Sequence, residues 1–295
     1  MTNQVTITVP ATSANLGPGF DCLGVALGLY NHVTFTAVSH PSLTIEVTGL
    51  DAAKVPTNEK NLVYQSACRM FDRLGQRPSG LHITQENNIP VGSGLGSSST
   101  AVLAGLLGAN ALVNGQLSQA DILAIATAEE GHPDNVAPAL LGGLVLGVME
   151  GDQVHIEPLP IAPQQVVIVT PDFELLTHDA RAALPTQISR QDAIFNASRL
   201  PLLVRALATA AYPQLTLAMQ DRLHQPYRLP LIPGMAEAFT AAYAAGAAGV
   251  ALSGAGPSLI AFAPDGHDQI VAAVTAVFRQ HNLGSRSWIL PIDTT

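Results

Sequence analysis

Hydrophobic and polar residues alternate with a period of two along much of the first fifty residues, as is typical of strands that bury one face. The alternation predicts four strands that we expect to begin an antiparallel sheet: Val5–Val9, Val25–Tyr30, His32–Val38 and Leu43–Thr48. Residues 10–24, between the first two, contain Gly17, Pro18 and Gly19, which predict an irregular loop.

Helical spacing replaces this alternation further along the chain. Apolar positions three to four residues apart predict a helix over Asn58–Leu74, with Gly75 as its stop. Ser118, with Asp121 three residues later, resembles a capping box. It predicts the start of a helix that ends near Gly131.

The remaining elements alternate between the two patterns. Further strands are predicted over Leu81–Gln85, Gly142–Met149, Val154–Leu159, Val166–Thr170, Val250–Ala263 and Arg286–Pro291. Further helices are predicted over Val102–Val113, Met235–Ala245 and Gln269–His281, and over His178–Leu223 with interruptions at Pro185, Pro201 and Pro213. Prolines at 158, 160 and 163 predict a boundary between domains 1–160 and 161–295. Strands flanked by helices in this order indicate an α+β fold.

Composition narrows the class of protein. A chain of 295 residues with 47% hydrophobic residues can fill a sizeable core, but it has no apolar run long enough to cross a bilayer. The first ten residues lack a basic start and an apolar signal core, so we expect a cytoplasmic protein without a membrane partner. Cys22 and Cys68 form no C-x-x-C pair, which argues against a metal cage or a disulfide framework. We expect buried thiols.

Charge excludes one class of partner. The net charge is −9 and basic residues do not cluster, so nucleic acid is not an expected partner. Of the 13 Lys and Arg residues only Lys54 and Lys60 are lysines, which leaves 11 arginines. The planar fork of arginine suits a two-point grip on a carboxylate or phosphate.

The segment Pro90–Ala101, PVGSGLGSSSTA, has the composition of a phosphate-binding loop. Its glycines lack Cβ atoms and allow close approach of a ligand, and its serines supply hydroxyl groups at a helix start. The free N–H groups of a helix start carry about half a unit of positive charge and favour an anion.

Better-known motifs do not fit this segment. No lysine follows Lys60, so a Walker A loop is excluded. Ser97 and Ser99 stand where the dinucleotide fingerprint needs its third glycine, and no serine has the flanking glycines of a hydrolase elbow. On the loop alone, a plain glycine turn between a strand and a buried helix remains an alternative.

The pattern that does fit, PxxxGLGSSS, resembles the nucleotide-phosphate loop of the GHMP kinases. SGAGPSLIAF, residues 253–262, is similar to a later glycine motif of that superfamily, although it could be a simple β-turn. By this resemblance the ATP-contacting residues are Asn61 near the adenine, the loop residues Pro90, Val91, Gly92, Ser93, Gly94, Leu95, Gly96, Ser97, Ser98, Ser99 and Thr100, and the later glycines Gly254 and Gly256.

Two more segments resemble the homoserine kinase branch of the superfamily. PATSANLGPGFDCLG contains Asn15 and Asp21, which the resemblance assigns to the substrate and which would otherwise be ordinary turn formers. EGHPDNVAPALLGG, residues 130–143, would place His132, Asp134 and Asn135 in the substrate pocket. A transition-metal site at His132 and Asp134 is the alternative, but it lacks further ligands at a recognisable spacing.

Two arginine segments complete the resemblance. Thr177 and Arg181 fit T-x-x-A-R-x-x-L-P, and Arg228 fits a second arginine segment. A substrate carboxylate would suit both guanidinium groups. Either arginine alone could equally be a solvated helix residue.

The resemblance implies MgATP-dependent phosphorylation of L-homoserine on the route to threonine. Mg²⁺ takes hard oxygen ligands, which by motif position are Ser98 and Glu130, with Glu129 as the alternative. The implied catalytic residues are Asp134, Thr177 and Arg181, although phosphoryl transfer does not require Asp134 as a base. The implied fold has a mixed N-terminal domain and a ferredoxin-like C-terminal domain, and a homodimer is the family tendency. A mevalonate-type GHMP kinase and a non-catalytic metabolite sensor remain alternatives.

Overall fold

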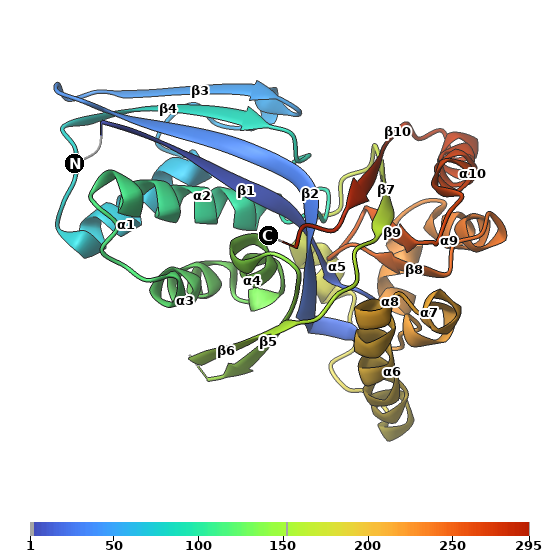
Figure 1. The fold of residues 1–295 in the computed structure, drawn as a ribbon. Coiled ribbons are helices and arrows are strands. Elements are labelled where there is room, and N and C mark those ends of the chain that lie inside the picture. The colour runs from blue at the N-terminus through green and yellow to red at the C-terminus, as the bar shows by residue number, and fades with distance from the viewer. Residues whose placement is uncertain (1–2, 152, 295) are drawn as a thin grey trace.

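The computed structural model describes residues 3–151 and 153–294. They form two sheets with helices packed against them (Figure 1). The first sheet has the order β3-β4-β2-β5-β6, with β1 paired to β2, and the second has the order β10-β7-β9-β8. Their strands are β1 Gln4–Asn15, β2 Gly19–Val38, β3 Leu43–Gly49, β4 Gly80–Asn87, β5 Leu144–Glu150, β6 Gln153–Leu159, β7 Gln165–Pro171, β8 Gly249–Leu252, β9 Leu259–Phe262 and β10 Ser285–Pro291. The α+β prediction is confirmed.

The first hairpin differs from the prediction. The loop predicted over residues 10–24 is strand almost throughout, because β1 and β2 continue to a turn at residues 16–18. Positive φ angles at Asn15, Leu16 and Gly17 confine the reversal of the chain to this short turn. The two strands predicted on either side of Asn31 are one strand, β2. β3 pairs with β4 in parallel, so the antiparallel prediction holds for β1 and β2 but not for β3.

Helix starts deviate more from prediction than helix ends. The first helix begins four residues later than predicted because the Asn61 side chain caps it, accepting a hydrogen bond from the Tyr64 N–H. It ends at Gly75 as predicted. The predicted capping box of Ser118 and Asp121 is present and confirmed.

The remaining helix predictions were partly wrong. Helix α2 starts at Ser97, five residues early, and α4, which begins with Pro133, was not predicted. Pro201 was predicted to interrupt the helix but lies inside the continuous helix α6, although proline removes one backbone N–H donor there. The helices are α1 Leu62–Leu74, α2 Ser97–Leu112, α3 Gln119–Glu130, α4 Pro133–Leu141, α5 Thr177–Ala182, α6 Arg190–Thr209, α7 Tyr212–Ala218, α8 Gln225–Arg228, α9 Met235–Ala244 and α10 His267–Gln280, with short 3-10 turns at Ala52–Lys54 and Leu229–Leu231.

Three apolar clusters hold these layers together. One lies between the first sheet and helices α1 to α4, and another lies between the second sheet and helices α9 and α10. The third contains Leu23 and Leu95 from the first half and Leu203 and Phe262 from the second, so the two halves share a core. The boundary predicted near residue 160 falls between the two sheets and stays a prediction. Within the described residues, no helix combines the length and hydrophobicity that a membrane span needs.

Candidate active site

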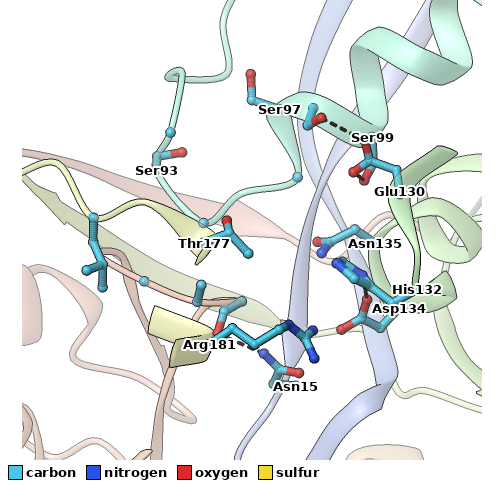
Figure 2. Close-up of a pocket in the computed structure, with 18 of the residues that line it drawn as sticks. Asn15, Ser93, Ser97, Ser99, Glu130, His132, Asp134, Asn135, Thr177 and Arg181 are labelled. Carbon is cyan, nitrogen blue, oxygen red and sulfur yellow. Dashed lines mark hydrogen bonds and ion pairs between the residues drawn. The ribbon is translucent and has the colours of Figure 1, made fainter. Parts of the chain in front are cut away.

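A pocket of about 370 Å³ lies where the two halves meet. The loop after β4, the start of α2, the α3–α4 corner, the first hairpin turn, α5 and the β8–β9 turn all contribute to its wall. Figure 2 shows that Glu130, His132, Asp134 and Asn135 lie on one side of it and Thr177 and Arg181 on another. Candidate residues from six distant segments are therefore brought together here.

The glycine-rich loop is fixed against the β8–β9 turn. Ser253 and Ser258 donate hydrogen bonds from their hydroxyl groups to the Gly94 and Ser93 carbonyls, at 2.7 and 2.6 Å. Gly94 has φ +80°, and a Cβ there would lie 2.3 Å from the Ser253 carbonyl oxygen. Only glycine fits this contact, so the two glycine motifs identified in the sequence form one surface.

Helix α2 starts at the end of this loop and aims its N-terminus at the pocket. Ser97, Ser98 and Ser99 form its first turn and all line the pocket. The first N–H groups of a helix have no partner within it, and the helix dipole places positive charge there. An anion such as a nucleotide phosphate is favoured at this point.

Not every residue of the loop faces the pocket. Pro90 and Leu95 are buried and do not line this pocket or the second pocket that adjoins it. Leu95 packs in the third core cluster. The Ser93 hydroxyl donates to the Pro90 carbonyl at 2.8 Å. Pro90 and Leu95 therefore support the loop from its buried side, while Ser97, Ser98 and Ser99 line the pocket.

A second pocket of about 320 Å³ adjoins the first and shares Gly92, Ser97 and Ser98 with it. Asn61, Val91 and Thr100, predicted to contact the nucleotide, belong to its lining. Asn61 is fully buried, and its amide oxygen accepts hydrogen bonds from the Gln85 side chain and the Tyr64 N–H. Its side chain thus orders the wall of this pocket.

Oxygen atoms that suit a magnesium ion lie beside the start of α2. Glu130 accepts hydrogen bonds from the Ser98 and Ser99 hydroxyl groups, each at 2.7 Å. Figure 2 shows Glu130 beside Ser99. Hydroxyl and carboxylate oxygens are the ligand types that Mg²⁺ takes, usually one or two from protein together with substrate phosphates. Glu129 instead is held by Ser66 and Arg69 on α1. The donor set therefore fits Mg²⁺ at Glu130 better than at Glu129.

The α3–α4 corner carries a histidine–carboxylate pair. His132 Nδ1 lies 2.5 Å from Asp134 Oδ1, and the hydrogen bond to Asp134 raises the pKa of His132, against the opposing effect of burial. Asn135 accepts a hydrogen bond from the Thr12 hydroxyl at 2.8 Å. No group of three or more His, Cys, Asp or Glu side chains that could hold a metal occurs in the described part of the chain, so the transition-metal alternative lacks support.

The first hairpin turn contributes Asn15 and Asp21. Asn15 donates to the Gly254 carbonyl at 2.8 Å and accepts from the Asp21 N–H at 2.9 Å, which fixes the turn against the β8–β9 turn. Asp21 forms a bidentate ion pair with Arg181 on α5, and this hydrogen bonding raises the pKa of Arg181. Cys22 and Cys68, both predicted to be buried, are partly exposed. Desolvation, with the nearby Asp134 and Asp21, raises the pKa of Cys22 to about 11.

Arg228 is almost completely buried yet lines the pocket. Its guanidinium group donates to the Ala180 and Gly254 carbonyls and to His224, each at 3.3 Å. Burial lowers its pKa, and Arg181 acts in the same direction. A buried cation with few acceptors favours an anionic ligand.

Comparison with known proteins assigns the family. Residues 61–143 match the model of the GHMP kinases N terminal domain, and residues 203–280 match that of the GHMP kinases C terminal domain. The chain is a GHMP kinase. It is 46% identical to the homoserine kinase of Trichormus variabilis, over 99% of this chain and 97% of that protein, and 50% identical to the homoserine kinase of Microchaete diplosiphon, over 92% and 89%.

Solved structures agree with this assignment. The homoserine kinase of Cytophaga hutchinsonii is 32% identical, with a TM-score of 0.87 over all of this chain and 96% of that one. L. major mevalonate kinase has a TM-score of 0.77 at 16% identity, over 99% of this chain and 97% of that one, and supports the fold alone. The two-domain GHMP kinase fold expected from the sequence is confirmed.

Some residues of this GHMP kinase's pocket were not predicted. Glu174, Leu175 and Leu176 line it directly before Thr177, and Ala255 lies within the glycine motif of the β8–β9 turn. Their closeness to predicted residues was the available signal. Thr12, which orients Asn135, lies in the segment that contains Asn15, but nothing in its spacing marked it.

Proposed function

We propose that this GHMP kinase transfers the γ-phosphoryl group of ATP to the side-chain hydroxyl of L-homoserine, giving ADP and O-phospho-L-homoserine. The observation that carries the proposal is that Asp21, Arg181 and Arg228 line the same pocket as the start of α2. A free amino acid carries one ammonium and one carboxylate group, which one acidic and two basic side chains can bind. The names of its homoserine kinase relatives support the same substrate.

The nucleotide lies across the two adjoining pockets in this proposal. Its phosphates lie at Ser97, Ser98 and Ser99, where backbone N–H groups and the helix dipole stabilise negative charge. The base lies in the second pocket, bordered by Asn61. The loop has no lysine, so these dipoles carry much of the electrostatic stabilisation.

Magnesium would be held by Ser98 and Glu130, whose oxygens are already adjacent. When bound, Mg²⁺ neutralises phosphate charge during transfer. Glu130 keeps both serine hydroxyls turned toward it and thereby orders the first turn of α2.

The amino acid is oriented by its two charges. Arg228 and Arg181 would receive the carboxylate and Asp21 the ammonium, while Asn15 and Asn135, which line the same pocket, would hydrogen-bond the side-chain hydroxyl. The hydroxyl oxygen forms a bond to the γ-phosphorus, the bond to the ADP oxygen breaks, and the hydroxyl proton leaves to solvent. Asp134 is already engaged with His132, so positioning and charge stabilisation carry the reaction in this account.

Product analysis by ³¹P NMR tests this proposal. The purified protein is incubated with MgATP and L-homoserine, L-threonine or mevalonate in parallel. We expect a new phosphomonoester resonance and ADP with L-homoserine, and much slower turnover of the others. Turnover of mevalonate alone would contradict the amino-acid assignment, and ATP binding without turnover of any alcohol would favour the sensor alternative.

Homodimer formation and a cytoplasmic location stay predictions. Light scattering coupled to size-exclusion chromatography measures the mass in solution, for which a dimer would give twice the chain mass of 30.7 kDa.

A further inference from the structure

A buried histidine lies behind the predicted carboxylate-binding arginine. The His224 side chain is fully buried, directly before α8. Its Nε2 lies 2.8 Å from the Gly17 carbonyl oxygen in the first hairpin turn, and its Nδ1 lies 3.3 Å from Arg228 Nη1. The ring thus joins that turn to the arginine.

The two partners determine the tautomer of His224. A carbonyl oxygen only accepts hydrogen bonds, so Nε2 carries the proton and donates to Gly17. A guanidinium only donates, so Nδ1 must present its lone pair to Arg228. Burial lowers the pKa of His224, and the charge of Arg228 acts in the same direction, against Asp221. The neutral ring with its proton on Nε2 is the one form that satisfies both contacts.

The position of His224 is itself held from two sides. The buried Asp221 carboxylate accepts hydrogen bonds from the N–H groups of Leu223, His224 and Gln225, at 2.9, 3.0 and 2.7 Å. The imidazole also stacks on Phe20, with ring centroids 5.1 Å apart. The Nδ1 lone pair therefore points in a fixed direction.

A neutral acceptor suits this place better than a carboxylate. Arg228 also lies over the Phe20 ring at 5.0 Å and donates from Nε and Nη1 to the Ala180 and Gly254 carbonyls. Among the described residues, protein acceptors contact Nε and Nη1, which leaves Nη2 for a ligand. An imidazole fixes the guanidinium plane without neutralising its charge, whereas a carboxylate would compete with the substrate's own.

We infer that His224 is a positioning residue that holds the Arg228 guanidinium in the orientation that receives the substrate carboxylate. The inference rests on the proposed role of Arg228 in binding L-homoserine. It deepens that proposal because the contribution of Arg228 to carboxylate binding then depends on His224, which does not itself reach the ligand.

Two substitutions of His224 separate the effects of its two side-chain hydrogen bonds, to Gly17 and to Arg228. His224→Asn puts an amide oxygen near the place of Nδ1 and retains an acceptor for Arg228. His224→Gln puts an amide N–H near the place of Nε2 and retains the bond to Gly17 but not the acceptor. For His224→Gln we expect the KM for L-homoserine to rise about tenfold or more, with the KM for ATP unchanged, as for loss of a hydrogen bond to a charged group. For His224→Asn we expect a change within about threefold.

Equal effects of the two variants on the KM for L-homoserine, or a parallel rise in the KM for ATP, would overturn the inference. Should both variants fail to fold, the ring ¹⁵N chemical shifts of His224 in the unaltered protein decide. A neutral ring with its proton on Nε2 at pH 7 is expected, and a proton on Nδ1 would overturn the inference. Absence of L-homoserine turnover in the unaltered protein would contradict the proposed function instead, so the two failures are distinguishable.

Discussion

Arg181 and Asp21 form a bidentate ion pair in the pocket, with Nη1–Oδ2 and Nη2–Oδ1 distances of 2.8 and 2.9 Å. The two residues come from α5 and from the start of β2 and stand 160 positions apart in the chain. Each offers the charge that one end of an amino-acid zwitterion needs. Binding of L-homoserine would exchange this pair for two pairs with the substrate.

Asp21→Asn tests this exchange. The variant cannot bind the ammonium group with a full charge, so we expect the KM for L-homoserine to rise at least about tenfold. The KM for ATP should stay unchanged. The two side chains are 46% and 32% exposed, so the loss of unfolding free energy should be about 1 kcal/mol or less.

Asp72→Asn is the matched control for this variant, because Asp72 pairs with Arg77 on the surface, away from the pocket. Its kinetic constants should equal those of the unaltered protein. Equal KM values for L-homoserine in the two variants would contradict the role of Asp21.

Glu130→Gln tests the magnesium assignment. Loss of the carboxylate charge beside Ser98 should raise the Mg²⁺ concentration needed for half-maximal rate and lower kcat at least about tenfold. Titration of the rate with Mg²⁺ at fixed ATP measures both effects. Glu129→Gln should change the Mg²⁺ dependence less, and a larger effect at Glu129 would reverse the assignment. Glu46→Gln, at an exposed pair with His82, serves as the control.

Gly94→Ala tests the contact between the two glycine motifs. The left-handed backbone and a Cβ 2.3 Å from the Ser253 carbonyl oxygen should together lower the unfolding free energy by about 2 to 4 kcal/mol. We also expect a higher KM for ATP, because the phosphate loop must move. Gly115→Ala is the control, because its φ is also positive but its Cβ would meet nothing within 4 Å. We expect it to lower the unfolding free energy, measured by chemical denaturation, by about 1 kcal/mol. Equal losses would contradict the contact argument.

The His132–Asp134 pair predicts a pH dependence. The hydrogen bond to Asp134 raises the pKa of His132 in the folded state above its ordinary value of 6.5. A raised pKa means that the folded state binds the proton more tightly, so the pair's contribution to stability is fully present below pH 6.5 and is lost as the pH rises through the raised pKa. The unfolding free energy, measured by chemical denaturation between pH 5.5 and 9, should therefore fall as the pH rises. This fall should be absent in Asp134→Asn. Identical profiles would contradict the pairing.

Asp134→Asn should also keep measurable turnover, because the reaction depends on positioning and charge stabilisation. Single-turnover measurement of phosphoryl transfer checks this. An inert variant that still binds both substrates would require Asp134 to act as a base.

Local signals in the sequence predicted much of the fold. The helix ends at Gly75 and Gly131 and the capping box of Ser118 and Asp121 depend only on residues close in the sequence. All three are present as predicted. The parallel pairing of β3 with β4 depends on distant residues, and the prediction was wrong. Helix α4 was missed because its prolines, Pro133 and Pro138, obscure a helical pattern although the first suits an N-terminal position.

The site could be predicted as a set of residues but not as a set of contacts. Motif resemblance identified Asp21, Arg181 and Arg228, and all three line one pocket. That Asp21 pairs with Arg181, and that His224 lies behind Arg228, follows only from tertiary packing. Side-chain pairing across 160 residues leaves no local pattern in a single sequence.

The most direct test of the account compares kcat/KM for L-homoserine, 4-hydroxybutyrate and 3-aminopropanol with MgATP. The second compound lacks the ammonium group and the third lacks the carboxylate, while both retain the primary hydroxyl. Because the pocket has charged partners for both groups, each analogue should lose at least about a hundredfold in kcat/KM. A value within about threefold of that for L-homoserine, for either analogue, would contradict recognition of the zwitterion by Asp21, Arg181 and Arg228.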